Sequence, residues 1–291
     1  EAPPAIISVF IGEAMTKLLD QIAKGKNTDG REVKRALDLI SKLPNLELDN
    51  TDRNRTSPFA FTGNKFEIRA VGSSANCALP MTILNTIVAQ QLVDFRIETE
   101  KLIKDGESKD GAILRVLRRY ITESKNILFE GDNYSQEWAD EAARRGLANV
   151  KTTPPALDFF ITASAKKVLV GNNIYTDREL DARYEVALEI YKRKVEIEAL
   201  TMADMVITQV IPSGMRYQAD LISNLKGLHD LGIKKKALTA QTELLEEVTE
   251  LINTLKAEAD SMLLAIEKAN KHHHAREIAS AFCDTVKPYF D

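Results

Sequence analysis

Four charged residues between Asp52 and Gly72 have the types and the spacing that could do chemistry. They are Arg55, Lys65, Glu67 and Arg69. The run Lys65–Arg69 alternates charged and apolar residues, so on a strand its charged side chains share one face, and Phe66 and Ile68 share the other. A cluster of arginine, glutamate and arginine is what a site needs to hold a metal ion on one side and a transferring phosphoryl group on the other. A solvated face of a sheet could carry the same pattern.

The residues around this cluster predict short strands. Polar turn residues at 54–56 and 63–64 flank apolar residues that can pack beneath a sheet, namely Phe59, Phe61, Phe66, Ile68 and Val71. Pro58 and Gly63 limit regular pairing to short pieces near residues 56–72. We therefore expect the charged side chains to gather above a well-packed sheet.

Length and composition restrict the class of protein. The chain has 291 residues, a formal net charge of −4 and 44% hydrophobic residues, which suits a soluble protein of one large or two modest domains. It carries no basic stripe and few aromatic residues, so we expect no nucleic acid partner. No apolar run reaches membrane-spanning length, so we expect no membrane partner. The only cysteines, Cys77 and Cys283, are far apart in sequence and indicate reduced thiols in a cytoplasmic protein.

Other chemical motifs carry little signal. Consecutive residues on a helix point about 100° apart, so His272, His273 and His274 cannot converge on one ion, and we interpret them as an exposed helix end. His229 stands alone on a connector and is interpreted as structural or solvated. The sequence has no nucleophile elbow, no phosphate-cradling glycine loop and no paired-histidine zinc helix. The segment Gly72-Ser73-Ser74 is interpreted as a turn between a strand and a helix.

Hydrophobic periodicity and capping signals predict a chain rich in helices. The expected helices cover residues 13–24, 31–43, a long stretch opened by Pro80, 112–128, a short helix capped by Ser135, another reaching residue 166, 176–227 with an interruption at 212–214, 238–270 and 276–286. Thr176-Asp177-Arg178-Glu179 fits a capping box. The basic residues 115, 118 and 119 are interpreted as a solvated helix flank. The last third of the chain should form antiparallel hairpins or a small bundle.

Several of these segments resemble one known family. The segments EAPPAIISVF, NRTSPFAFTGNKFEIRAVGSSAN, TDRELDARYE and YKRKVEIEAL carry the resemblance. With Glu1-Ala2-Pro3, Asn54-Arg55 and the run Lys65–Arg69 followed by Ser73-Ser74-Ala75-Asn76, the chain resembles the second half of the catalytic domain of glutamine synthetase, and the type III branch in particular. The resemblance covers essentially the whole chain and is most specific before the first long helix.

This resemblance implies an ATP-dependent ligase that joins glutamate and ammonia through γ-glutamyl phosphate, using Mg²⁺ or Mn²⁺. It implies that Glu67 ligates the metal ion near the nucleotide phosphates. It also implies that Arg69 faces glutamate and the glutamyl phosphate, and that Arg55 faces the ATP phosphates. Glu1 matches a glutamate on a mobile flap that closes the site and helps to take a proton from ammonium. The family assembles as homo-oligomeric stacked rings, which the resemblance implies here for the full-length protein.

The chain also departs from the family pattern. In the better-known bacterial branch another arginine follows Asn54-Arg55, where this chain reads Ser57-Pro58-Phe59-Ala60. The metal-ligating glutamates and histidine of the family's first half, and its small N-terminal domain, do not occur in this sequence. The chain opens on Glu1 and an apolar run without a methionine, so we expect a portion of a larger protein. The resemblance implies two divalent ions in the site, and one carboxylate cannot hold both, so we expect the chain alone to be inactive.

We therefore predict an α+β, predominantly helical fold. The end of a glutamine-synthetase-type catalytic sheet, with strands near 56–72, would be followed by a helical C-terminal bundle. Residues 1–195 would complete the catalytic domain, with a helical insertion at about 12–51, and residues 196–291 would form a helical extension. Two alternatives stay open, namely a non-catalytic interaction or regulatory module of the same fold and a related γ-glutamyl-amine ligase.

Overall fold

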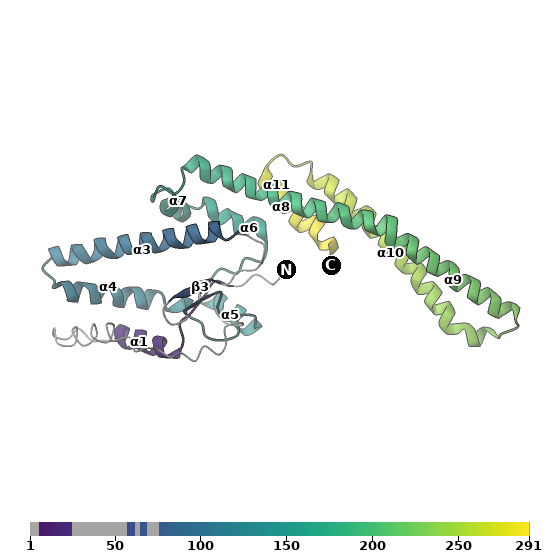
Figure 1. The fold of residues 1–291 in the computed structure, drawn as a ribbon, viewed down its shortest axis with the longest axis horizontal. Coiled ribbons are helices and arrows are strands. Elements are labelled where there is room, and N and C mark those ends of the chain that lie inside the picture. The colour runs from purple at the N-terminus through teal and green to yellow at the C-terminus, as the bar shows by residue number, and fades with distance from the viewer. Residues whose placement is uncertain (1–5, 25–56, 62–64, 69–75, 291) are drawn as a thin grey trace. The chain divides into compact units, whose positions relative to one another are not determined.

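The computed structural model describes residues 6–24, 57–61, 65–68 and 76–290. These residues belong to two compact units. The first unit comprises Glu1–Lys151 and Ser164–Ile174, and the second comprises Thr152–Ala163 and Tyr175–Asp291. Helices dominate both units, and one small sheet lies in the first (Figure 1), which confirms the predicted fold class.

The sheet joins the start of the chain to the segment with the charged cluster. Its strands are β1 (Val9–Phe10), β2 (Phe59–Phe61) and β3 (Phe66–Ile68), in that spatial order. β1 runs parallel to β2, and β3 runs antiparallel to β2. The predicted strands near residues 56–72 are therefore confirmed at 59–61 and 66–68.

The first unit contains helices on both sides of α4. They are α1 (Glu13–Lys24), α3 (Ala78–Lys104), α4 (Lys109–Glu123), the short η1 (Lys125–Ile127), α5 (Gln136–Arg144) and most of α7 (Ala163–Leu169). α4 lies between α1 and α3 (Figure 1) and buries Ala112, Leu114 and Val116. The predicted helix 13–24 is confirmed, whereas the predicted helix 31–43 lies outside the described residues.

The predicted solvated flank of α4 is confirmed for Arg115 and Arg119, which are exposed, and is wrong for Arg118, which is half-buried. Arg118 donates through Nε to the backbone carbonyl of Ile22 at 3.0 Å, which ties α4 to α1. Arg119 forms an ion pair with Glu98 of α3. Arg118 therefore binds α1 and Arg119 binds α3, because α4 packs against both of these helices.

The C-terminal helices form the second unit. Its elements are α6 (Thr153–Leu157), η2 (Asp158–Ile161), α8 (Asp177–Met205), η3 (Val206–Val210), α9 (Ile211–Asp230), η4 (Lys235–Leu238), α10 (Thr239–Ala269), α11 (Ala275–Ala281), η5 (Phe282–Val286) and η6 (Lys287–Phe290). α8 and α9 follow each other as one long rod, and α10 returns antiparallel beside them (Figure 1). The predicted antiparallel hairpin is confirmed. The proposed domain division at residue 195 falls inside α8 and stays a prediction.

A heptad spacing explains the hairpin. From residue 238 to the end of α10, buried or half-buried residues recur at spacings that alternate strictly between three and four. They are 238, 241, 245, 248, 252, 255, 259, 262, 266 and 269. α9 presents a matching series at 211, 214, 218, 221, 225 and 228. Gln218 donates to Thr249 across the hairpin at 2.6 Å. At Gly214 an added Cβ would lie 3.2 Å from Ile252, so glycine lets the two helices approach closely.

Pro212 does not interrupt the long helix, contrary to the sequence prediction. Proline lacks an N–H group, and its ring crowds the carbonyl four residues earlier. The five residues Val206–Val210 form a π-helical turn, which widens the backbone at that point. The half-buried positions 206 and 211 are five residues apart, one more than the heptad spacing allows. The wider π-turn takes up the extra residue, so α8 and α9 both pack on the same side of α10.

A charged cluster ties three elements of the second unit together. Arg276 of α11 donates to both oxygens of Asp158, at 2.7 and 2.8 Å. The hydroxyl of Tyr184 on α8 donates to the same carboxylate at 2.7 Å. The donation from Arg276 lowers the pKa of Asp158 against the effect of partial burial, and the Tyr184 hydroxyl lowers it further. Burial, and then the bond to Asp158, raise the pKa of Tyr184 to about 12. We interpret the cluster as structural, because its groups satisfy one another.

None of the described helices is both long enough and apolar enough to cross a membrane.

The capping box at the start of α8 gives a first prediction. The Thr176 hydroxyl accepts from the Glu179 amide at 3.2 Å, and the Glu179 carboxylate accepts from the Thr176 amide at 2.8 Å. Thr176→Ala should lower the free energy of unfolding by about 1 kcal/mol and speed hydrogen exchange in the first turn of α8. The same substitution at exposed Thr201, inside α8, is the control and should not destabilise. Equal effects at both positions would contradict the capping role.

Asp158 gives a second prediction. Because its pKa is lowered in the folded state, its stabilisation is present above the unfolded pKa of about 3.9 and is lost as pH falls through the folded pKa. Asp158→Asn should lower the free energy of unfolding by about 1 kcal/mol at neutral pH, with little difference from the parent in strong acid. Denaturant titrations from neutral to acid pH check this, with exposed Asp220→Asn of α9 as control. A deficit that persists unchanged in acid would refute the ionic contribution.

Candidate functional site

The register of the sheet fixes the direction of Glu67. Glu67 pairs with Ala60 of β2, and Ala60 pairs with Phe10 of β1. Because directly paired residues point to the same face, Glu67, Ala60 and Phe10 share one face of the sheet. Ala60 is fully buried in the central strand. Glu67 lies beside it on β3, which is an edge strand of the sheet, and its longer side chain extends from the same face.

Lys65 and Glu67 lie together on that face, as the alternation predicted. Lys65 Nζ is 2.7 Å from Glu67 Oε1, and the two side chains are 62% and 29% exposed, respectively. An ion pair this open to water contributes at most about 1 kcal/mol, so a cation can compete with the lysine for the carboxylate. Carboxylate oxygen is the hard ligand that Mg²⁺ and Mn²⁺ prefer. The position is therefore chemically suited to hold one side of a divalent ion.

The opposite face of β3 is less covered than the sequence suggested. Phe66 stacks on Phe59 with ring centroids 4.8 Å apart and the planes nearly parallel. Phe66 and Ile68 nevertheless remain 48% and 46% exposed. The expectation of a well-packed sheet beneath the charged face is thus wrong for these two residues. Among the described residues, the ring contacts of Phe66 come from β2 alone.

The other predicted site residues cannot be placed beside Glu67. Glu1, Arg55 and Arg69 lie outside the described residues, as do Ser73 and Ser74. Their convergence with Glu67 stays a prediction. Within the described part of the chain, no group of three or more histidine, cysteine, aspartate or glutamate side chains could hold a metal ion.

Two contacts that the sequence did not reveal hold β1 in place. The Ser8 and Ser57 hydroxyls, both buried, lie 2.9 Å apart and join the segments that lead into β1 and β2. The Phe129 amide donates to the Val9 carbonyl at 3.1 Å, and the Phe129 ring stacks on Trp138 at 3.7 Å. Alternation identifies strands but not which distant hydroxyl or ring will meet them, so no local signal could have predicted these pairs.

Arg145, at the end of α5, completes this support. It donates to the Leu128 carbonyl at 2.8 Å and lies over the Trp138 ring at 5.3 Å. Ile6, next to β1, packs in the same cluster as Trp138. The predicted Ser135 cap is confirmed, and the chain leaves the helix at Gly146, where φ is +74°. The sheet edge that carries Glu67 is therefore anchored through β1 to α5.

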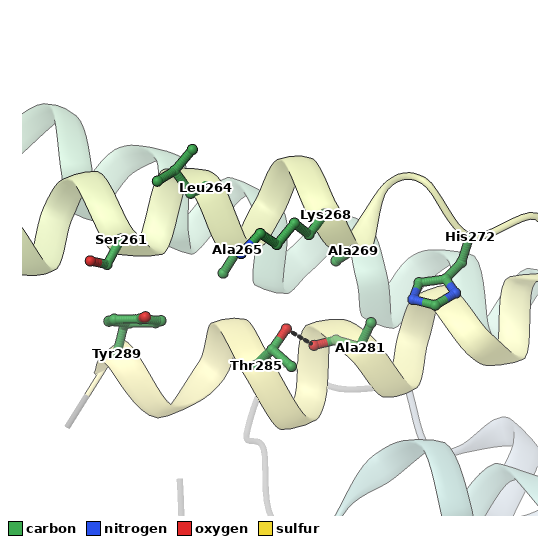
Figure 2. Close-up of a pocket in the computed structure, with 9 residues that line it drawn as sticks. All are labelled: Ser261, Leu264, Ala265, Lys268, Ala269, His272, Ala281, Thr285 and Tyr289. Carbon is green, nitrogen blue, oxygen red and sulfur yellow. Dashed lines mark hydrogen bonds between the residues drawn. The ribbon is translucent and has the colours of Figure 1, made fainter.

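A second candidate is a groove in the second unit, between α10 and the segment from α11 to η6 (Figure 2). Its volume is about 440 Å³, and Lys268, His272 and Tyr289 supply its main polar groups. The Thr285 hydroxyl is taken up by the Ala281 carbonyl at 2.6 Å (Figure 2). His272 Nδ1 lies 3.9 Å from the Glu277 carboxylate. The groove is open, and its polar groups do not converge on one point (Figure 2), so it has no evident chemistry.

The histidine run lies where the sequence placed it. His272, His273 and His274 are exposed in the turn between α10 and α11. His229, which was assigned to a connector, instead lies exposed in the last turn of α9. None of these histidines belongs to a metal-ligating group within the described residues.

A third candidate lies between α3 and α4, where charged side chains line a hollow of about 480 Å³. Arg115 pairs with Glu107 at 3.2 Å, and Arg119 pairs with Glu98. The Tyr120 hydroxyl donates to Glu98 at 3.1 Å, and burial, followed by this bond, raises the pKa of Tyr120. Both signs of charge are matched here, so the hollow favours no ion. Among the described residues, Glu67 remains the best-suited position for chemistry.

Comparison with known proteins relates the chain to glutamine synthetases. Residues 112–229 match the family model described as the glutamine synthetase C-terminal domain. The whole chain is 41% identical to a glutamine synthetase of Bacteroides fragilis, of which it covers 41%. It is 37% identical to a type-3 glutamine synthetase of Dictyostelium discoideum, with 97% of this chain and 38% of the relative aligned.

A further relative extends the comparison. The chain is 31% identical to a glutamine synthetase of Butyrivibrio fibrisolvens, with 100% of this chain and 42% of the relative aligned. The chain thus spans about two fifths of the length of the curated relatives it matches. These matches confirm the resemblance that the sequence motifs indicated.

Proposed function

Because this chain is homologous over its whole length to glutamine synthetases, a type-3 enzyme among them, we propose that the full-length protein containing it is an ATP-dependent glutamate–ammonia ligase. The observation that carries the proposal is the match of all 291 residues at 41% identity, with Glu67 presented at an open sheet edge. Residues 1–195 belong to its catalytic domain, and residues 196–291 form its helical extension. This chain alone does not turn over, since it offers one part of a shared site.

The divalent ion, Mg²⁺ or Mn²⁺, fits the described residues in part. Glu67 provides a reachable hard oxygen donor, and the remaining ligands come from outside the described residues. When bound, the ion supplies positive charge where phosphate oxygens gain negative charge. Glu67 would hold the ion through its carboxylate, in place of its ion pair with Lys65.

The other roles follow from the family motif. Arg55 binds the ATP phosphates, and Arg69 binds glutamate and stabilises charge on the transferring phosphoryl group. Glu1 takes a proton from ammonium as the flap over the site closes. The protein works in the cytoplasm as a homo-oligomer of stacked rings.

A substrate assay of the full-length protein tests the proposal. Glutamate, ATP and ammonia should give glutamine, ADP and phosphate, whereas glutamate with alkylamines in place of ammonia should react at least about tenfold more slowly. Faster reaction with an amine would assign the protein to γ-glutamyl-amine ligases. Absence of ATP cleavage with every amine would identify a non-catalytic module.

Glu67 gives the third prediction. In the full-length protein, Glu67→Gln should lower turnover on the order of 100-fold and raise the divalent-ion requirement, because an ionised metal ligand becomes a neutral amide. Glu100→Gln, at a 57% exposed position of α3, is the matched control and should leave turnover unchanged. Sedimentation of both variants should match that of the parent. Unchanged turnover in Glu67→Gln would remove this residue from the site.

Arg69 gives the fourth prediction. Arg69→Ala should slow phosphoryl transfer by roughly 100-fold while changing nucleotide affinity only a few-fold, because its charge acts where negative charge develops. A γ-glutamyl hydroxamate assay beside a nucleotide titration separates the two effects. If affinity falls as much as the rate does, Arg69 acts in nucleotide binding instead.

A further inference from the structure

Helix α8, together with Ile207 in the π-helical turn η3 that continues it, carries a second apolar stripe that the described residues of its own unit do not cover fully. Its members are Val186, Ile190, Ile197, Leu200 and Ile207, whose exposed fractions are 53%, 51%, 57%, 47% and 37%, respectively. Together with Arg193 and Asp204, which are also exposed, they follow the alternating spacing of four and three residues of a heptad repeat. This is the spacing of a coiled-coil seam.

The stripe lies on the side of α8 that faces away from the unit's core. The buried positions Leu188, Val195 and Ala199 pack within the second unit. At about 100° per residue, the exposed stripe is centred roughly half a turn from these buried residues. With a rise of about 1.5 Å per residue, the stretch from 186 to 207 is about 32 Å long. α8 therefore offers two seams, one of them used inside the unit.

The two charged residues in the stripe decide which partner fits. Arg193 and Asp204 stand at equal distances on either side of a point between residues 198 and 199. If a second α8 lies antiparallel across that point, residues whose numbers sum to 397 face each other. Ile197 then faces Leu200 of the other copy, Ile190 faces Ile207, and Arg193 faces Asp204.

We propose that this face of α8 binds the same face of a second copy of the chain in an antiparallel, two-fold symmetric coiled coil. A two-fold axis repeats every contact, so the seam contains two Arg193–Asp204 ion pairs flanking a central apolar layer. Apolar residues meet apolar residues in the 197/200 and 190/207 layers, and Val186 lies beyond them at each end of the seam. This proposal identifies the exposed stripe as a surface for self-association. It does not depend on the ligase activity proposed above.

A parallel pairing of two α8 helices does not suit this stripe. In register, it would place Arg193 against Arg193 and Asp204 against Asp204 of the other copy, and like charges at a seam repel. The antiparallel arrangement converts both repulsions into attractions. The positions of these charges therefore fix orientation and register together.

Disulfide trapping in the full-length protein tests the register. Cys77 is exposed, so the background variant carries Cys77→Ser. The double variant Arg193→Cys/Asp204→Cys should form a covalent dimer under mild oxidation with copper phenanthroline. Within one helix the two positions are about 17 Å apart along the axis, too far for a bridge inside one chain. Each single variant should show no covalent dimer on a denaturing, non-reducing gel, because in the proposed register neither position meets itself.

Charge exchange and a matched apolar substitution complete the test. Arg193→Asp should raise the dissociation constant for self-association about tenfold, and Arg193→Asp/Asp204→Arg should restore it. Ile197→Ser should weaken association, whereas Ile222→Ser, at a 50% exposed position of α9, should not. Sedimentation over a dilution series measures all four.

Specific outcomes would overturn the proposal. Cross-linking of either single variant would indicate a parallel seam, because only there does a position meet itself in the other copy. Failure of the double variant to cross-link, while circular dichroism shows intact helices, would mean that this face does not meet a second copy. The glutamine-forming assay tests the ligase proposal separately, so the self-association proposal and the ligase proposal can fail independently.

Discussion

The antiparallel pairing of Glu67 with Ala60 is the constraint on which the functional account depends. A slip of one residue between β2 and β3 would turn Glu67 to the opposite face and bring Phe66 or Ile68 in its place. The stacked rings of Phe59 and Phe66 oppose such a slip, because it would separate them. The register is in turn supported through β1, whose neighbours Ser8 and Ile6 tie it to Ser57 and to the Trp138 cluster. A short strand thus acquires a defined orientation from contacts far away in sequence.

A second constraint acts in the helical unit, where heptad spacing organises both the hairpin and the free face of α8. The π-helical turn at Val206–Val210 lets the chain carry a proline without losing that spacing. The cost of the wide turn is offset by continuous packing of α8, α9 and α10 along one side. One helix therefore serves two purposes, with its core residues on one side and its exposed stripe on the other.

Local signals in the sequence predicted a large part of this fold. The capping box at Thr176, the Ser135 cap and the long repeat from Leu238 onward each depend on neighbours within a turn or two, so their residues alone suffice. The alternation at Lys65–Glu67 likewise predicted which side chains share a face, because a strand's period is fixed.

Other features depend on distant partners and could not be predicted in this way. The interaction of Arg118 with the Ile22 carbonyl requires α1 beside α4, and a charge run alone does not reveal it. The sequence marked Pro212 as a break because the compensating π-turn depends on packing against α10. For the candidate site, Glu67 was identified through its strand and its family motif, whereas its relation to Glu1, Arg55 and Arg69 depends on segments outside the described residues.

The most direct test of the account is to locate the metal ion itself. A crystal structure of the full-length protein with Mn²⁺ and a non-hydrolysable ATP analogue, recorded with anomalous scattering from manganese, would do so. The account predicts an anomalous peak at bonding distance from a Glu67 carboxylate oxygen, with Lys65 displaced from its contact. Manganese bound to the nucleotide, with the Glu67 carboxylate still paired with Lys65 and not bonded to the ion, would contradict it.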